Sequence, residues 1–386
     1  MHEVRVNRKA ARRIASGHPW IFESDIVDKG DAAPGAAVIV INLAGRPLGT
    51  AHFSSTSQIG LRLLSHDVRE IGPEFFAQRL AAAEAHRRLV VSGTDAYRVV
   101  HGEGDLLPAL VVDRYQDYLV LQTLNQGMDA AREWIVASLV ELFSPRGIVA
   151  RNDAPVRVRE ALTLECGVIY GDVPDTVEFR MNGLRLYADL LHGQKTGAFL
   201  DQRENYLAAA RYARGKALDC FTSSGGFALH LAPVCESVEA LDSSGAALAA
   251  AGRNASLNGI SNIEFREADI FEELAAYASA RRQFQTVVLD PPAFAKSRST
   301  LEGAVRGYKE INLRALRLLG PGGILVTCSC SQRLTEAAFL ELVAQASLDA
   351  GRQLRVLERR TQGPDHPILL TVPETHYLKC LILQVV

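Results

Sequence analysis

The sequence lacks the paired cysteines that would indicate a zinc site or a disulfide framework. Its six cysteines are scattered, with no CxxC pair and no histidine at zinc-binding spacing: Cys166, Cys220, Cys235, Cys328, Cys330 and Cys380. We therefore expect no metal ion, and free thiols in a reducing, cytoplasmic environment.

Long apolar runs are absent as well. The longest, Ile324–Val326 and Cys380–Leu383, have the length of strands, whereas a membrane-spanning helix needs about twenty apolar residues. The N-terminus has no signal-peptide core. Its arginines could indicate a transit peptide, but the turn and strand signals that follow at once disfavour that interpretation. We expect no association with a membrane.

A large excess of positive charge is also missing. The net charge is −2, with 42 basic and 44 acidic residues, so the whole chain gives no electrostatic indication of nucleic-acid binding. The first thirteen residues differ, because five basic side chains stand there against the single acid Glu3. Such a cluster is most often a solvated surface. Alternatively, Arg8 and Arg12 would contact the phosphates of an RNA.

The length of 386 residues is too great for one core and predicts several domains. Apolar and alternating runs at 37–42 and 59–64 predict a small β-barrel near the N-terminus. A helical pattern at 73–91, a hairpin at 110–121, a helix at 128–143 and a strand at 147–151 predict a small central α+β domain.

Beyond about residue 185, strand-like and helix-like runs alternate. Strands are expected at 217–221, 237–241, 263–266, 286–289 and 324–328, each followed by a helix. Five such units predict an α/β domain with a mostly parallel, Rossmann-like sheet covered by helices on both faces. The expected domains are 1–72, 73–185 and 186–386.

The ends of the first three strands predict a cofactor site. The first strand contains Asp219 and runs into a turn with Gly225, which lets a ligand lie against the backbone. Asp242 ends the second strand, where it could bind ribose hydroxyls, and Asp269 follows the third, where it could bind an adenine amine. Asp219 could instead be an ordinary strand-end acid, and Asp269 a helix N-cap.

Together these acids favour a cofactor of the adenosine type. The turn does not have the GxGxxG pattern, which disfavours a nicotinamide oxidoreductase. No P-loop lysine is present, which disfavours a nucleoside triphosphatase.

The fourth and fifth strands end in residues suited to chemistry on a planar base. The loop Asp290-Pro-Pro-Ala-Phe-Ala-Lys296 is stiffened by its prolines, so that Phe294 could stack on a base and Asp290 could bond its edge. A rigid turn capped by an aromatic ring is the alternative. Cys328 and Cys330 would share a face of the fifth strand. A cysteine facing a pyrimidine suggests covalent catalysis, although such a cysteine is more often a small buried hydrophobe.

Several longer segments are more specific. They are Gly17-His-Pro-Trp-Ile-Phe22, Ser57-Gln-Ile-Gly-Leu-Arg62, Glu103-Gly-Asp-Leu-Leu-Pro108, Val112-Asp-Arg-Tyr115, Gly193-Gln-Lys-Thr-Gly-Ala-Phe-Leu-Asp-Gln-Arg-Glu-Asn205, Asp290–Lys296, Gly307-Tyr-Lys-Glu-Ile-Asn312 and Ser329-Cys-Ser331. With them, nearly the whole chain resembles the bacterial large-subunit (23S) ribosomal RNA 5-methylcytosine methyltransferases of the RlmI type. That family joins an N-terminal PUA domain and a central domain to a Rossmann-like class I methyltransferase.

The resemblance implies an enzyme that uses S-adenosyl-L-methionine, releases S-adenosyl-L-homocysteine and methylates C5 of a cytosine in ribosomal RNA. It implies that Cys330 is the nucleophile and that Asp290 orients the base. Cofactor binding would fall to Phe199, Gln202, Arg203, Asp219, Gly225, Asp242, Asp269 and Asp290. Substrate binding would fall to Phe294, Lys296, Arg8 and Arg12. A homodimer is left open.

Some positions depart from the family pattern. Ser223-Ser224 stands where Tyr-Thr is common, Tyr206 stands where an arginine is common, and Ser54-Ser55 replaces a turn that usually contains asparagine. None of them removes an expected catalytic group. Two other functions stay open: methylation of an exocyclic amine by the Asp-Pro-Pro-Ala loop, with Cys330 dispensable, and an RNA-binding protein that has lost catalysis.

Overall fold

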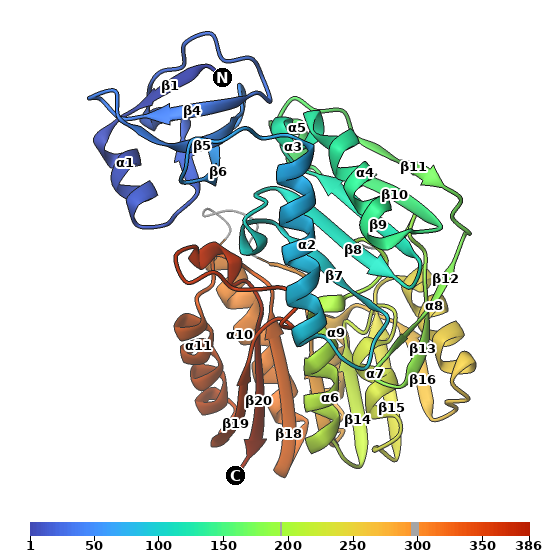
Figure 1. Ribbon diagram of the computed structural model, residues 1–386. Coiled ribbons are helices and arrows are strands. Elements are labelled where there is room, and N and C mark those ends of the chain that lie inside the picture. Colours follow the sequence, from blue (N-terminus) through green and yellow to red (C-terminus); the bar gives the residue numbers. More distant parts are fainter. Residues whose placement is uncertain (194, 295–300) are drawn as a thin grey trace. The chain divides into compact units, whose positions relative to one another are not determined.

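The computed structural model describes residues 1–193, 195–294 and 301–386 (Figure 1). The chain divides into two compact units, each built from separate segments. Unit 1 consists of Met1–Arg180, Ala188–Ala198 and Pro364–Thr375; unit 2 consists of Met181–Tyr187, Phe199–Gly363 and His376–Val386. The division into three domains at residues 72 and 185 stays a prediction.

The N-terminal part of unit 1 is a six-stranded sheet in the order β2-β6-β5-β4-β1-β3. Its elements are β1 (Glu3–Val6), α1 (Arg8–Ala15), β2 (Trp20–Phe22), η1 (Glu23–Asp25), β3 (Ile26–Asp28), β4 (Ala37–Ile41), β5 (Pro47–Phe53) and β6 (Ile59–Ser65). The expected strands at 37–42 and 59–64 are confirmed. Helix α1 was not predicted from the sequence. Asn7 begins it by accepting a hydrogen bond from the backbone of Ala10, and it buries Ala10 and Ile14 against the sheet.

The rest of unit 1 is a five-stranded sheet, in the order β11-β10-β9-β8-β7, with helices packed on it. Its elements are α2 (Pro73–Val90), β7 (Ala96–His101), η2 (Gly102–Asp105), β8 (Leu110–Tyr115), β9 (Tyr118–Thr123), α3 (Gln126–Ala130), α4 (Arg132–Phe143), β10 (Gly147–Asn152), α5 (Val156–Arg159) and β11 (Glu165–Gly171). The expected helix at 128–143 is interrupted at Ala131. β12 (Val177–Met181) and β13 (Leu184–Ala188) form a separate pair.

Unit 2 contains a seven-stranded sheet in the order β16-β15-β14-β17-β18-β20-β19. Its strands are β14 (Lys216–Cys220), β15 (Ser237–Asp242), β16 (Ile263–Glu267), β17 (Phe284–Leu289), β18 (Leu319–Ser329), β19 (Leu354–Arg360) and β20 (Lys379–Val385). The five expected strands are parallel to one another, while β20 and β19 extend the sheet as antiparallel strands. The predicted Rossmann-like α/β architecture is confirmed.

Helices cover the sheet of unit 2 (Figure 1). They are η3 (Leu200–Gln202), α6 (Arg203–Tyr212), α7 (Gly226–Leu231), α8 (Gly245–Leu257), α9 (Ile270–Ser279), α10 (Leu301–Arg317) and α11 (Glu336–Asp349); η4 (Pro373–Thr375) belongs to unit 1. The last three α-helices bury Leu274, Tyr308 and Phe339 against the central strands. Because β14, β15, β17 and β18 are parallel, the loops at their carboxyl ends meet at one edge of the sheet.

Two features are absent from residues 1–193, 195–294 and 301–386, which the structure describes. In these parts of the chain, no helix is both long and apolar enough to cross a membrane. In the same parts, no three histidine, cysteine or acidic side chains are grouped so that they could hold a metal ion.

Candidate active site

The turn between β14 and α7 has an unusual backbone. Phe221, Ser223 and Gly225 have φ angles of 65°, 49° and 90°. The left-handed region is uncommon for residues other than glycine, and such conformations persist where surrounding interactions enforce them, often at functional sites. The turn between β14 and α7 therefore has a specific conformation that its surroundings must hold in place.

Asp219, on β14, stabilises this turn through hydrogen bonds. Its Oδ2 atom accepts a hydrogen bond of 2.6 Å from the Thr222 hydroxyl and one of 2.9 Å from the backbone of Ala228. Its Oδ1 atom is buried and has no hydrogen-bond partner among the described residues. Burial, together with the nearby carboxylates of Asp290 and Asp242, raises the pKa of this carboxyl to about 7, although the two hydrogen bonds act to lower it.

Asp242 ends β15 beside the same turn. One of its oxygens accepts the backbone N–H of Ser223 and the other that of Ser244, both at 2.9 Å. The carboxylate therefore joins the β14 turn to the start of α8. Asp269 is exposed. It caps α9 by accepting a hydrogen bond of 3.1 Å from the backbone N–H of Glu272, which confirms the alternative prediction of a helix N-cap. A role for Asp269 in binding adenine stays a prediction.

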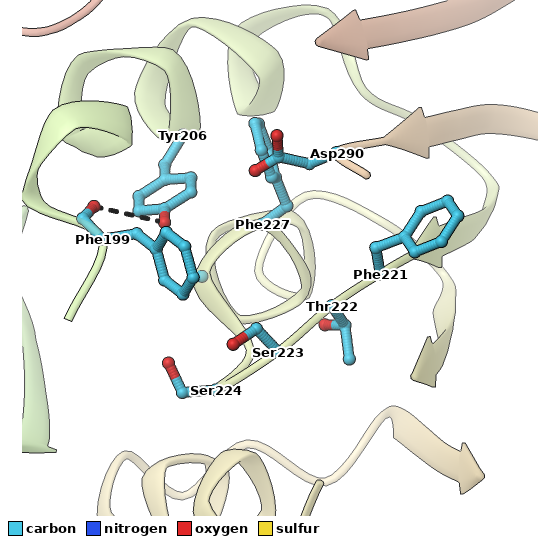
Figure 2. A pocket seen from close by; sticks show the side chains of 9 residues that line it. Phe199, Tyr206, Phe221, Thr222, Ser223, Ser224, Phe227 and Asp290 are labelled. Atoms are coloured by element: carbon cyan, nitrogen blue, oxygen red, sulfur yellow. Dashed lines mark hydrogen bonds between the residues drawn. The ribbon is translucent and has the colours of Figure 1, made fainter. Parts of the chain in front are cut away.

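A pocket opens above the turn (Figure 2). It has a volume of about 320 Å³, which includes the solvent at its mouth, and is lined by Phe199, Tyr206, Phe221, Thr222, Ser223, Ser224, Gly226, Phe227 and Asp290. This set brings together the predicted cofactor residues Phe199 and Asp290 with the turn that contains Gly225.

Tyr206, from α6, forms a wall of the pocket. Its ring lies 4.8 Å from that of Phe227 and 5.0 Å from that of His230, and its hydroxyl donates to the Phe199 carbonyl at 3.5 Å (Figure 2). A Cβ atom on Gly226 would lie 2.4 Å from the Tyr206 ring. The absence of a side chain on Gly226 thus allows α7 to begin directly against this wall.

A chain of hydrogen bonds fixes Asp290 in the pocket. The Gln202 side-chain amide donates to Asp290 Oδ2 at 3.0 Å, and its oxygen accepts from the Asn205 amide at 2.7 Å. Arg360 donates to the oxygen of Asn205 at 2.9 Å. Because Asn205 and Arg360 fix the direction of the Gln202 amide, its N–H points at the carboxylate. Gln202 therefore acts on the pocket through Asp290.

Other predicted residues lie elsewhere. Arg203 is buried, pairs with Glu204, and does not line the pocket. The ring of Phe294 packs 4.7 Å from that of Tyr308 and 5.9 Å from that of Phe271, so in this structure it belongs to an aromatic cluster. Lys296 lies outside the described residues.

Arg8 and Arg12 are exposed on α1 in unit 1 and are not among the residues that line the pocket. Their predicted contact with RNA is untested by the pocket geometry.

The two cysteines near the end of β18 have different surroundings. Cys328 is fully buried opposite Cys380 on β20, and burial holds the pKa of its thiol well above the ordinary value. Cys330 follows the last residue of the strand and is partly exposed. Its sulfur lies 3.9 Å from the carbonyl oxygen of Pro291, the residue after Asp290. The regular strand that would place both thiols on one face ends at Ser329.

Sequence reasoning missed several pocket residues, notably Tyr206 and Phe227. Tyr206 was noticed only as a departure from a family pattern. Phe227 directly follows the two glycines of the turn, which is a signal that could have identified it. No local pattern predicts that the ring of Tyr206 packs on the helix that begins at Gly226.

Comparison with known proteins agrees with this geometry. A model of PUA-like domains matches residues 4–66, and a model of S-adenosylmethionine-dependent methyltransferases matches residues 107–383. A solved structure described as an S-adenosylmethionine-dependent methyltransferase from Streptococcus mutans has a TM-score of 0.85 at 19% identity, with both chains covered completely. Another methyltransferase, solved in complex with S-adenosylhomocysteine, has a TM-score of 0.87 at 18% identity, again over both complete chains. Fold and site thus define an S-adenosylmethionine-dependent methyltransferase.

Curated relatives narrow the family. Proteins named ribosomal RNA large subunit methyltransferase I from Tolumonas auensis and Shewanella amazonensis are each 40% identical to this chain, over 99% of both chains. The chain belongs to this family, with a PUA-like domain and a methyltransferase domain.

The residues present fit S-adenosylmethionine. Asp219 has a buried oxygen without a described partner, and the Asp242 carboxylate is bonded by backbone amides. Among the described residues that line the pocket, none is a lysine, arginine or histidine. His230 packs against the ring of Tyr206 but does not line the pocket. A pocket bordered by carboxylates suits a ligand that carries a sulfonium and an ammonium group.

Proposed function

We propose that this enzyme methylates C5 of a cytosine in large-subunit (23S) ribosomal RNA through a covalent adduct on Cys330. The proposal rests on one observation above others: the partly exposed sulfur of Cys330 lies beside the Asp290–Pro291 loop, while the neighbouring thiol of Cys328 is buried. The printed names of the relatives support ribosomal RNA as the substrate, and such a substrate favours a cytoplasmic enzyme.

The cofactor would occupy the pocket above the β14 turn. Asp242 would accept hydrogen bonds from the ribose and Asp269 from the adenine amine. Phe199, which lines the pocket, would contact the adenosine. Gly225 would let the ligand approach the backbone, and Asp219, Gln202 and Arg203 would support the residues that contact it.

Cys330 would provide nucleophilic catalysis. Its thiolate adds to C6 of the cytosine, a C6–S bond forms, and the electron pair of the C5–C6 double bond makes C5 nucleophilic. When bound, S-adenosylmethionine would supply the electrophilic methyl group that C5 accepts, with the neutral thioether S-adenosylhomocysteine as the leaving group. A base then accepts the C5 proton, the double bond reforms, and the sulfur leaves C6 as the thiolate. Asp290 would hold the polar edge of the cytosine during these steps.

RNA would be held by further residues and by the expected domains. Phe294 would stack on the target base and Lys296 would contact the RNA beside it. Arg8 and Arg12, both exposed on α1, would contact phosphates as part of the PUA-like domain at 1–72. The central domain at 73–185 would join it to the methyltransferase domain at 186–386.

The test is methylation of ribosomal RNA with labelled S-adenosylmethionine, followed by nucleoside analysis. We expect label in 5-methylcytidine from the wild type and from Cys328→Ala, and a loss of at least a thousandfold in Cys330→Ala, because no other group replaces the nucleophile. A fully active Cys330→Ala variant, or an N-methylated product, would contradict the covalent mechanism and favour methylation of an exocyclic amine.

A further inference from the structure

A lysine is buried behind the proposed nucleophile. Lys379 is the first residue of β20. In the antiparallel pairing of β20 with β18 it lies opposite Ser329, which is the residue before Cys330. Its side chain is almost completely buried, with 2% of the residue exposed. Lysine is rarely buried in this way unless its charge is compensated, because removing an ammonium from water is costly.

The partners of this ammonium are backbone carbonyls. Nζ donates to the Ser331 carbonyl at 2.7 Å and to the Tyr377 carbonyl at 2.8 Å. In the parts of the chain that the structure describes, Lys379 forms no ion pair with a carboxylate within 4.0 Å, and two of its three N–H groups have acceptors in the protein. Carbonyl oxygens alone do not cancel the charge.

The neighbouring groups show which anion would balance it. Cys330 and Glu336 are the two groups whose negative charge would stabilise the ammonium. From α10, the Tyr308 hydroxyl also faces this segment and hydrogen-bonds with the Ser331 hydroxyl at 3.0 Å. Burial lowers the pKa of Lys379 to about 8, against the attraction of Cys330 and Glu336. Lys379 therefore still carries its charge at pH 7, where a thiolate beside it would be favoured.

We propose that Lys379 is a positioning residue for the nucleophile: its ammonium stabilises the thiolate of Cys330, and its hydrogen bond to the Ser331 carbonyl holds the Cys330–Ser331 segment at the end of β18. This proposal rests on the proposed function, because the covalent mechanism is what gives the Cys330 thiolate a catalytic role. Cys328 gains nothing from this cation, since it lies within the strand and is held neutral by burial.

The thiol itself can be titrated without catalysis. Protein without RNA or cofactor is alkylated with iodoacetamide between pH 6 and pH 10, and each cysteine is quantified by mass spectrometry of its peptide. Exposed Cys166 is an internal control, because it belongs to unit 1 and its charged neighbours are Arg151, Asp153 and Asp189. We expect Cys330 in the wild type to react with an inflection below the value of about 8.5 for an ordinary thiol.

Lys379→Met removes the charge and keeps an unbranched side chain, whereas Lys379→Arg keeps the charge. We expect alkylation of Cys330 at pH 7 to fall about tenfold in Lys379→Met and to stay near the wild-type rate in Lys379→Arg, with Cys166 unchanged in both. Methylation by Lys379→Met should fall at pH 7 and recover as the pH rises toward 9, which a purely structural role would not produce.

Two results would overturn the proposal. One is an unchanged Cys330 profile in a folded Lys379→Met protein. The other needs no variant: an inflection for wild-type Cys330 at or above that of an ordinary thiol. Both are read without methyl transfer, so they are distinct from a failure of the proposed function, which is read from 5-methylcytidine formation by Cys330→Ala.

Discussion

The buried ion pairs of unit 1 differ from the buried charged groups that lie around the pocket and the proposed nucleophile in unit 2. In unit 1, Arg98 on β7 and Asp113 on β8 form a two-point ion pair of 2.8 and 2.9 Å, and Arg87 pairs in the same manner with Asp105. In unit 2, Asp219 has hydroxyl and amide partners but no described cation.

Lys379 in unit 2 is similar, because its hydrogen-bond acceptors are carbonyls. The difference separates two uses of buried charge. The ion pairs of unit 1 are complete within the protein and serve the fold. The incompletely balanced charges of unit 2 surround the pocket and the proposed nucleophile, where a ligand or a reacting group completes them. Breaking an ion pair of unit 1 should therefore lower stability more than ligand binding. Changing a charged group of unit 2 should lower ligand binding more than stability.

The largest effect is expected from breaking an ion pair of unit 1. Arg98→Gln leaves the fully buried Asp113 without its cation, which should lower the free energy of unfolding by about 3–5 kcal/mol. Both tryptophans, Trp20 and Trp134, belong to unit 1, so tryptophan fluorescence during urea unfolding reports on this unit. Asp219→Asn is the matched control and should leave that transition unchanged. Equal shifts in the two variants would remove the distinction between the regions.

The second effect concerns the shape of the pocket. Gly226→Ala would place a Cβ atom 2.4 Å from the Tyr206 ring, and relieving that overlap should cost about 1–3 kcal/mol and weaken S-adenosylmethionine binding about tenfold or more. Gly252→Ala is the control, because its Cβ on α8 would meet nothing within 4 Å. Calorimetric titration compares the two. Unchanged binding in Gly226→Ala would show that the cofactor does not use this pocket.

The third and smallest effect is a pH dependence that follows from Asp219. Its pKa is about 7 in the fold, so a cationic ligand must displace a proton below that pH. Affinity for S-adenosylmethionine should rise several-fold between pH 6 and pH 8 and then level off, with a flatter profile for S-adenosylhomocysteine, which lacks the sulfonium charge. Asp219→Asn should abolish the difference between the two profiles. Identical profiles for both ligands in the wild type would contradict this role.

The same shift has a consequence for stability. Folded Asp219 keeps a proton that the unfolded chain releases above about pH 4, so the folded state binds more protons between about pH 4 and pH 7. The contribution of Asp219 to the free energy of unfolding is therefore largest at low pH and falls as the pH rises through that window.

Much of the site could be predicted because it follows the ends of strands. Asp219, Asp242 and Asp290 lie at or directly after parallel strands that hydrophobic runs reveal, and the sheet topology brings their carboxyl ends together. The Ser329-Cys-Ser331 segment was found for the same reason. The alternation of strand and helix predicted the fold of unit 2 without any knowledge of its side-chain contacts.

Other features depend on contacts between segments that are distant in the sequence. Lys379 reaches Ser331 because β20 returns antiparallel to β18, and no local pattern predicts that pairing. Tyr206 comes from a helix before the first strand of the parallel sheet. Helix α1 was missed because its four charged side chains were interpreted only as a basic cluster. They alternate with the buried Ala10 and Ile14 at helical spacing, which is a signal that could have predicted the helix.

The central claim is a covalent bond between Cys330 and the target base, and it can be trapped. Ribosomal RNA containing 5-fluorocytidine is incubated with S-adenosylmethionine and enzyme; the fluorine at C5 cannot leave as a proton does, so the adduct should persist. We expect a protein–RNA complex that survives denaturation, maps to Cys330, forms with Cys328→Ala and fails to form with Cys330→Ala. Formation of 5-methylcytidine on ordinary RNA without any trapped complex, or a complex through another residue, would contradict the account.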